Sequence, residues 1–367
     1  MTSLGRLAAG LSTFVVFTSA VHAQERRTIL SAQVCGGCRV QLIPVVQLIA
    51  PDTLPAVVSI TRLTQGGPGE YLLSPLADDA SYIALSSRGS LRRFVTRHGA
   101  GPGEWNGLRL VRRYHGDTLL VLTNRVSLVV HDSTLVAKAP VAQPWDVAVL
   151  EGGEVVMNSP GGGGHTLQLW APGLRSAIVI DDSSAHVKHP FAPSILRVAA
   201  SRDGGFWSAP TNTYQFTRRR ADGSTSGRYV RQADWFPDWG ANEQAESFIP
   251  GGHLLPRIMS LREDSLGMLW ILVNVPTGRR APSGDLRAGR GKEPVAMPGV
   301  ASWGIEFRSV IEVIDPAAGS LLTTFRSPEI LSGFVGEDQV YGLREVADGS
   351  IAVNVFRVSL IEPSRGR

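Results

Sequence analysis

The sequence repeats one pattern of four short apolar runs, and this repetition constrains the fold more than any other feature. The runs are rich in Val, Ile, Leu, Thr and aromatic residues and are bounded by Gly, Asp, Asn or Pro. This is typical of β-strands joined by turns. Units of this kind occupy residues 108–140, 145–181, 195–230 and 257–326. They predict consecutive four-stranded sheets.

Two further units are less regular. One covers residues 71–95, and the other, residues 340–363, ends the chain with three expected strands, VYGLREV, SIAVNVF and RVSLIEP. Six four-stranded units match the blades of a β-propeller, which bury their faces against each other in a closed ring. We therefore predict an all-β protein, a β-propeller of six four-stranded blades. The alternative is a β-sandwich or two small β domains.

The three-stranded last unit predicts how the ring closes. A strand from the N-terminal part of the chain can complete it, supplied either by residues 57–60 or by the segment near Cys35. Such closure removes the exposed strand edges that otherwise invite aggregation.

The N-terminus has the features of a secretory signal peptide. Arg6 precedes an apolar run over residues 7–21, and a small-x-small site ends at Ala23. The run is shorter than the ~20 residues needed to span a bilayer. We predict that residues 1–23 are removed, leaving an exported monomer, periplasmic or extracellular, with no transmembrane span. The alternative is an uncleaved signal that anchors the protein.

Cys35 and Cys38 are the whole cysteine inventory. In an oxidising compartment the pair predicts a local disulfide. A redox role needs a helix N-terminus, whereas the flanking sequence looks extended, and zinc needs two further ligands that are not nearby. We expect residues 24–55 to form an N-terminal segment with this pair, followed by the propeller over residues 56–367.

The charge pattern argues against nucleic-acid binding. The formal net charge is +4, and the 36 basic residues are mostly scattered arginines. Neither a basic helix nor an aromatic-basic RNA motif is present. The 43% hydrophobic content is that of a globular protein with a real core.

One five-residue motif, which we call the GPGE motif, occurs twice, as GPGEY and GPGEW. Glycines permit tight turns and proline fixes φ, so the glutamate can accept backbone N–H bonds while the aromatic residue fills the seam between blades. We interpret the motif as a structural joint between blades; the alternative is a ligand contact. Its residues are Gly67, Pro68, Gly69, Glu70 and Tyr71, then Gly101, Pro102, Gly103, Glu104 and Trp105.

These two segments resemble the G-x-G-P-G-E-[FYW] signature of bacterial exported six-bladed β-propellers, which are related to the NHL and YncE-like propellers. The turns at residues 221–223 and 315–319 are similar as well. The resemblance covers about residues 55–362 and implies the fold. It implies no particular activity.

Two long insertions, residues 231–256 and 277–307, fall on one face of the predicted ring. That face carries the connections between blades and the loops between second and third strands. Loops of this length are usually functional or disordered. Trp235 and Trp239 in the first insertion are candidate ligand-binding residues; alternatively they cap the hydrophobic top of a blade.

Four charged residues on the predicted innermost strands are the other candidates. Arg109, Asp146, Arg197 and Arg257 occupy comparable positions in successive units. Converging on the channel, the arginines can hold an anionic group by bidentate hydrogen bonds. The alternative is a set of solvated channel residues that pair with one another.

Metal and enzyme signals are weak. His186 and His189 have a metal-ligand spacing but lie in a polar, proline-flanked stretch. Calcium lactonases also use six-bladed propellers, and Glu104, Asp146 and Asn274 can be cast as their ligands. No cofactor is predicted; calcium belongs to the enzyme alternative.

The sequence therefore favours a binding module over an enzyme. We predict an exported propeller that binds a partner protein, or a small anionic or saccharide-like ligand, on its loop-bearing face. The alternative is a metal-dependent hydrolase of the lactonase type or a lyase, because propeller enzymes draw catalytic residues from several blades and leave no local motif.

Overall fold

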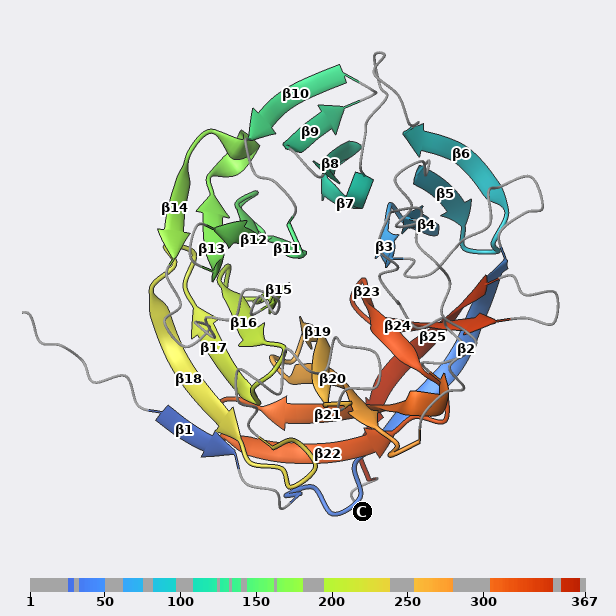
Figure 1. Cartoon of the computed structure of the whole chain (residues 1–367), viewed down its shortest axis with the longest axis vertical. Coiled ribbons are helices and arrows are strands. Elements are labelled where there is room, and N and C mark those ends of the chain that lie inside the picture. Colours follow the sequence, from blue (N-terminus) through green and yellow to red (C-terminus); the bar gives the residue numbers. More distant parts are fainter. Residues whose placement is uncertain are drawn as a thin grey trace, which may run out of the picture.

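The strands of the computed structural model form six β-sheets arranged as blades around one axis (Figure 1). In each sheet a first strand lies innermost and its successors follow outwards. This confirms the predicted six-bladed β-propeller. The structure describes residues 26–29, 33–49, 62–74, 82–96, 108–123, 126–131, 134–139, 144–161, 164–180, 195–237, 254–279, 304–345 and 351–363.

The first three blades follow one another along the chain. Blade 1 contains β3 (Arg62–Gln65), β4 (Glu70–Ser74), β5 (Tyr82–Ser86) and β6 (Leu91–Thr96). Blade 2 contains β7 (Leu108–His115), β8 (Thr118–Thr123), β9 (Ser127–His131) and β10 (Thr134–Ala139). Blade 3 contains β11 (Asp146–Val149), β12 (Val155–Gly161), β13 (Gly164–Trp170), the short 3-10 helix η1 (Pro172–Leu174) and β14 (Ala177–Ile180).

The last three blades complete the ring and include two strands from the N-terminal part of the chain. Blade 4 contains β15 (Leu196–Ala200), β16 (Phe206–Pro210), β17 (Gln215–Arg219), β18 (Thr225–Arg231) and the added β1 (Arg26–Ile29). Blade 5 contains β19 (Arg257–Glu263), β20 (Leu269–Pro276), β21 (Phe307–Asp315) and β22 (Ser320–Arg326). Blade 6 contains β23 (Leu331–Val335), β24 (Gln339–Glu345), β25 (Ile351–Ile361) and β2 (Arg39–Ile49).

The ring closes through β2, the outer strand of blade 6. It pairs with β25 in antiparallel register from Arg39 opposite Ile361 to Ile49 opposite Ala352, with an irregularity at Pro44. Proline lacks the N–H that a regular ladder needs, so a bulge is a suitable place for it. Of the two predicted closing segments, the one near Cys35 provides the strand, while residues 57–60 lie outside the described residues.

Two strand assignments made from the sequence were wrong in detail. SIAVNVF and RVSLIEP form one long strand, β25, because no turn residue separates them. The remaining strand of blade 6 is β23, whose sequence LSGFV is short and interrupted by Gly333. The innermost strand of blade 1, β3, was also not recognised, since its RLTQ sequence has one large apolar residue.

The predicted disulfide joins Cys35 to Cys38, with a Cα–Cα distance of 5.4 Å. It lies between β1, which pairs in parallel with β18, and β2. The intervening chain is attached to the outer strand of blade 5: Val34 N donates to Leu321 O (3.0 Å), and Thr323 Oγ1 donates to Cys38 O (3.0 Å). The N-terminal segment thus contacts three consecutive blades.

The hydrophobic core is divided among the seams between blades. Leu48 of β2 packs with Leu63 of blade 1 and Val353 of blade 6 in one buried cluster. Leu120 of blade 2 packs with Met157 of blade 3 in another. Each blade therefore depends on its neighbours for burial of its faces, as the repeat pattern predicted.

Replacing Leu48 tests the ring closure. Its side chain is 1% exposed in the seam between blades 6 and 1, so we expect Leu48→Ala to lower the free energy of unfolding by about 2–5 kcal/mol. Ile43 of the same strand is 43% exposed, and Ile43→Ala is the matched control with little effect. Urea denaturation measures both; equal stabilities of the two variants would contradict a closing role for β2.

Candidate ligand-binding site

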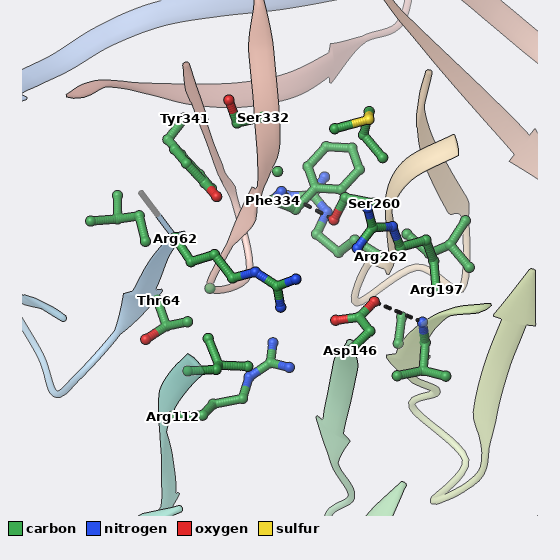
Figure 2. Close-up of a pocket in the computed structure, with 18 of the residues that line it drawn as sticks. Arg62, Thr64, Arg112, Asp146, Arg197, Ser260, Arg262, Ser332, Phe334 and Tyr341 are labelled. Atoms are coloured by element: carbon green, nitrogen blue, oxygen red, sulfur yellow. Dashed lines mark hydrogen bonds between the residues drawn. The ribbon is translucent and has the colours of Figure 1, made fainter. Parts of the chain in front are cut away.

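A cavity of about 340 Å³ lies on the ring axis, and the inner strands of all six blades line it. Four charged residues from four successive blades form what we call the central cluster: Arg62, Arg112, Asp146 and Arg197. Figure 2 shows Arg62, Arg112 and Asp146 directed towards the same space. Three positive charges therefore surround one negative charge in a partly enclosed site.

Several of the lining residues also hold the blades together. Adjacent inner strands share no backbone ladder, so side chains make the bonds between them. In each bond, a side chain of one inner strand pairs with the backbone of the adjoining one. The bonds are Thr64 Oγ1 to Val111 O (2.7 Å), Arg112 Nη1 to Val147 O, Val198 N to Asp146 Oδ2 (3.1 Å), Arg197 Nε to Ile258 O (3.4 Å) and Phe334 N to Ser260 Oγ (3.2 Å).

The carboxylate of Asp146 is fixed at both oxygens. Oδ1 accepts a hydrogen bond from Val147 N (3.0 Å), and Oδ2 accepts one from Val198 N (3.1 Å). Hydrogen bonds from backbone N–H groups to a carboxylate are stronger than those between neutral groups. Asp146 therefore joins blade 3 to blade 4 and places a negative charge at a defined point beside the arginines.

Burial governs the electrostatics of Arg197. Desolvation lowers the pKa of its guanidinium, Asp146 opposes this by raising it, and the positive charge of Arg62 lowers it further. The neighbouring Arg257 is affected in the same way: burial lowers its pKa to about 10, and the charge of Arg197 adds to the effect. An anion placed here would relieve the repulsion among these cations.

Arg62 differs from the other members of the central cluster. Its guanidinium makes no hydrogen bond or ion pair with another residue in the part of the chain that the structure describes, although its charge acts on Arg197 and Tyr341. Figure 2 shows the side chain extending from β3 into the cavity. Arg62 thus has the donors most available to a ligand.

The lining also contains Arg262, Glu263 and Glu337, and the first two are engaged in packing. The Arg262 guanidinium lies 4.6 Å from the ring centre of Trp270 and 5.1 Å from that of Phe334. Glu263 accepts a hydrogen bond from Ser201 Oγ (2.6 Å) and another from Trp207 Nε1. These two residues stabilise blade 5 against its neighbours.

The predicted inner-strand residues are found at different places. Asp146 and Arg197 line the cavity, whereas Arg257 lies next to Arg197 and is not part of the lining. Arg109 belongs to β7, and its side chain lies outside what the structure describes. Sequence reasoning missed Arg62 and Arg112.

These omissions have local causes. The pairing of β7 with β8 is irregular near both ends of β7, between Leu108 and Leu110 and between Arg113 and His115. Such shifts change which side chains face the axis, so Arg112 lines the cavity where counting from the turn favoured Arg109. Arg62 was missed because β3 itself was not recognised.

Trp235 belongs to an aromatic cluster at one end of blade 4. Its ring centre is 5.5 Å from that of Tyr214 and 6.1 Å from that of Phe236, and it packs on the buried core of blades 4 and 5. Below it, a buried bidentate ion pair joins Arg231 to Glu312 (2.8 and 2.9 Å). This agrees with a capping position for Trp235; Trp239 lies outside the described residues.

The first copy of the GPGE motif lies within blade 1 rather than between two blades. It forms the turn between β3 and β4, in which Gly69 has a φ of +67° and Glu70 N donates to Gly67 O (3.0 Å). The buried Tyr71 does reach the adjoining blade, because its hydroxyl donates to Gln339 Oε1 (2.8 Å). The second copy, residues 101–105, falls outside the described ranges.

No group of three or more His, Cys, Asp or Glu side chains is arranged to hold a metal ion among the described residues. His186, His189 and Glu104 are not among them. Asn274 is buried in β20, where its Oδ1 accepts a hydrogen bond from Ser309 Oγ (2.8 Å), and it does not line the cavity.

Comparison with known proteins identifies the fold alone. No family model matches the chain, and no curated protein matches its sequence. A member of the DUF4221 family from Bacteroides vulgatus superposes with a TM-score of 0.57 at 9% identity, covering 88% of this chain and 99% of its own. A Bacteroides fragilis protein with a provisional description as an exported protein gives 0.52 at 9%, covering 92% and 100%.

The chain is thus a six-bladed β-propeller with a positively charged axial cavity. In the described part of the chain, no helix is long and apolar enough to cross a membrane.

Replacing Asp146 tests its structural role. Asp146→Ala leaves the N–H groups of Val147 and Val198 without their acceptor, so we expect the free energy of unfolding to fall by roughly 2–4 kcal/mol. Asp146→Asn, which keeps one acceptor oxygen, should fall between this variant and the wild type. The exposed Asp234→Ala is the control. Wild-type stability of Asp146→Ala in urea denaturation would contradict the assignment.

Proposed function

We propose that this protein is an exported binding protein that holds a small organic anion in the axial cavity, with Arg62, Arg112 and Arg197 as the anion-binding residues. The observation that supports the proposal is the convergence of these three arginines, from three blades, on one cavity. A cavity of about 340 Å³ suits a small molecule.

The charge balance favours an anion. Asp146 is the one acidic residue of the central cluster, and both its oxygens already accept backbone hydrogen bonds. Over the whole lining, four arginines face three acidic residues, Asp146, Glu263 and Glu337, so a net positive charge remains. Planar guanidinium groups match carboxylate and phosphate geometry with two parallel hydrogen bonds.

The walls of the cavity favour a ligand with an organic part. Met259, Leu261, Phe334 and Tyr341 contribute apolar and aromatic surface beside the arginines. A sugar acid or an aliphatic carboxylate presents both the charge and the carbon skeleton that such a lining accommodates.

Export is supported by two features of the N-terminal part of the chain. The sequence has an apolar run and a small-x-small site ending at Ala23, and Cys35 and Cys38 form a disulfide, which fits an oxidising compartment. The Bacteroides fragilis neighbour is also described as exported, on a provisional basis.

Binding of a partner protein on the loop-bearing face stays a prediction. The greater part of both insertions, residues 238–253 and 280–303, lies outside the described residues. The enzyme alternative also stays a prediction; the described residues hold no group of three or more His, Cys, Asp or Glu side chains placed to bind a metal ion.

The proposal can be tested by ligand-induced thermal stabilisation and calorimetry on the full mature chain. Gluconate and hexanoate are compared with their neutral counterparts, sorbitol and hexanamide. We expect at least one anion to raise the melting temperature and its neutral counterpart not to. Arg62→Gln should weaken binding of that anion about tenfold or more, because a charged hydrogen bond is lost.

Arg62 is the informative position because its guanidinium makes no described bond to an adjoining blade. The unliganded Arg62→Gln variant should therefore melt at or above the wild-type temperature. The control is Arg175→Gln, an exposed arginine outside the cavity. Failure of every anion to bind, or undiminished binding by Arg62→Gln, would overturn the proposal.

A further inference from the structure

A second cavity, of about 530 Å³, opens at one end of the ring axis, on the face that carries the turns between first and second strands. We call it the vestibule. Turns of blades 1, 2, 3 and 6 form its rim, through Pro68, Gly116, Glu151 and Gly336. The strand ends from which the two long insertions leave lie on the opposite face.

The vestibule and the axial cavity adjoin each other and share lining residues. Thr64, Arg112 and Phe334 belong to both. A ligand held by the central cluster can therefore extend past Arg112 into the vestibule. The shape is an elongated site along the axis rather than a single compartment.

Two successive residues of one strand, Arg112 and Arg113, line the vestibule. Arg112 also lines the axial cavity, whereas Arg113 lines the vestibule alone. Arg113 therefore adds a second arginine on the vestibule side of the central cluster.

Arg113 is held in place by the backbone. Its Nε donates to Gly116 O (2.7 Å), and its Nη1 lies 3.7 Å from where a Cβ on Gly67 would stand. Within the described residues, its two terminal nitrogens make no hydrogen bond. The guanidinium is therefore oriented between the turn of blade 2 and the first GPGE turn, with donors available.

We infer that the vestibule is a second anion subsite, in which Arg113, beside the GPGE turn at Pro68, receives the distal acidic group of an elongated dianion. The inference rests on the proposed function, since the first acidic group is held by the central cluster. The ligand class is a linear molecule with an acidic group at each end, such as an α,ω-dicarboxylate or an aldaric acid. The first GPGE motif then lies beside the ligand.

The test compares matched monoanions and dianions by calorimetry on the full mature chain. The pairs are gluconate with glucarate, and monocarboxylates with dicarboxylates of six, eight and ten carbons. We expect at least one dianion to bind about tenfold or more tightly than its matched monoanion, beyond the statistical factor of two. The preference should peak at the chain length that spans from the central cluster to Arg113.

Arg113→Gln should abolish this preference and leave the monoanion affinity unchanged, whereas Arg113→Lys should retain part of it. The exposed Arg175→Gln is again the control, and the melting temperature of each unliganded variant verifies folding. Equal affinities for monoanion and dianion, or a preference that survives Arg113→Gln, overturns the second subsite alone. Binding of neither overturns the proposed function as well.

Discussion

The pairing of β2 with β25 is the constraint on which the rest of the structure depends. It completes blade 6 and closes the ring. Only in a closed ring do the inner strands of all six blades converge on one cavity. The central cluster has no local sequence signature for this reason: its four residues are brought together by closure and not by spacing along the chain.

If the proposed function holds, the side chains of the inner ring serve both the structure and the ligand. Arg112, Asp146 and Arg197 each bond to the backbone of an adjoining blade while lining the cavity. Fixed in this way, they are held in position before any ligand arrives, which lowers the entropic cost of binding. Arg62, which has no such described bond, is the member whose replacement separates affinity from stability.

The sequence predicted the architecture better than the site. Blades 2 to 5 were recognisable because their strands are apolar runs bounded by Gly and Asp turns. The short strands β3 and β23 were missed because β3 has one large apolar residue and β23 is interrupted by Gly333. Arg109 was preferred over Arg112 because the irregular pairing of β7 cannot be predicted from the periodicity of the sequence. The first GPGE motif was placed between blades because strand β3, which precedes it, was not recognised.

The position of β2 also has a consequence for how the chain acquires its structure. β2 precedes almost all of the propeller along the chain, yet its partner β25 is the last strand. A chain made or delivered from its N-terminus onwards must keep β2 unpaired until its final residues are available. Contacts of such long sequence separation form slowly and leave strand edges exposed meanwhile. The ring can therefore close only after β25, the last strand of the chain, is available to pair with β2.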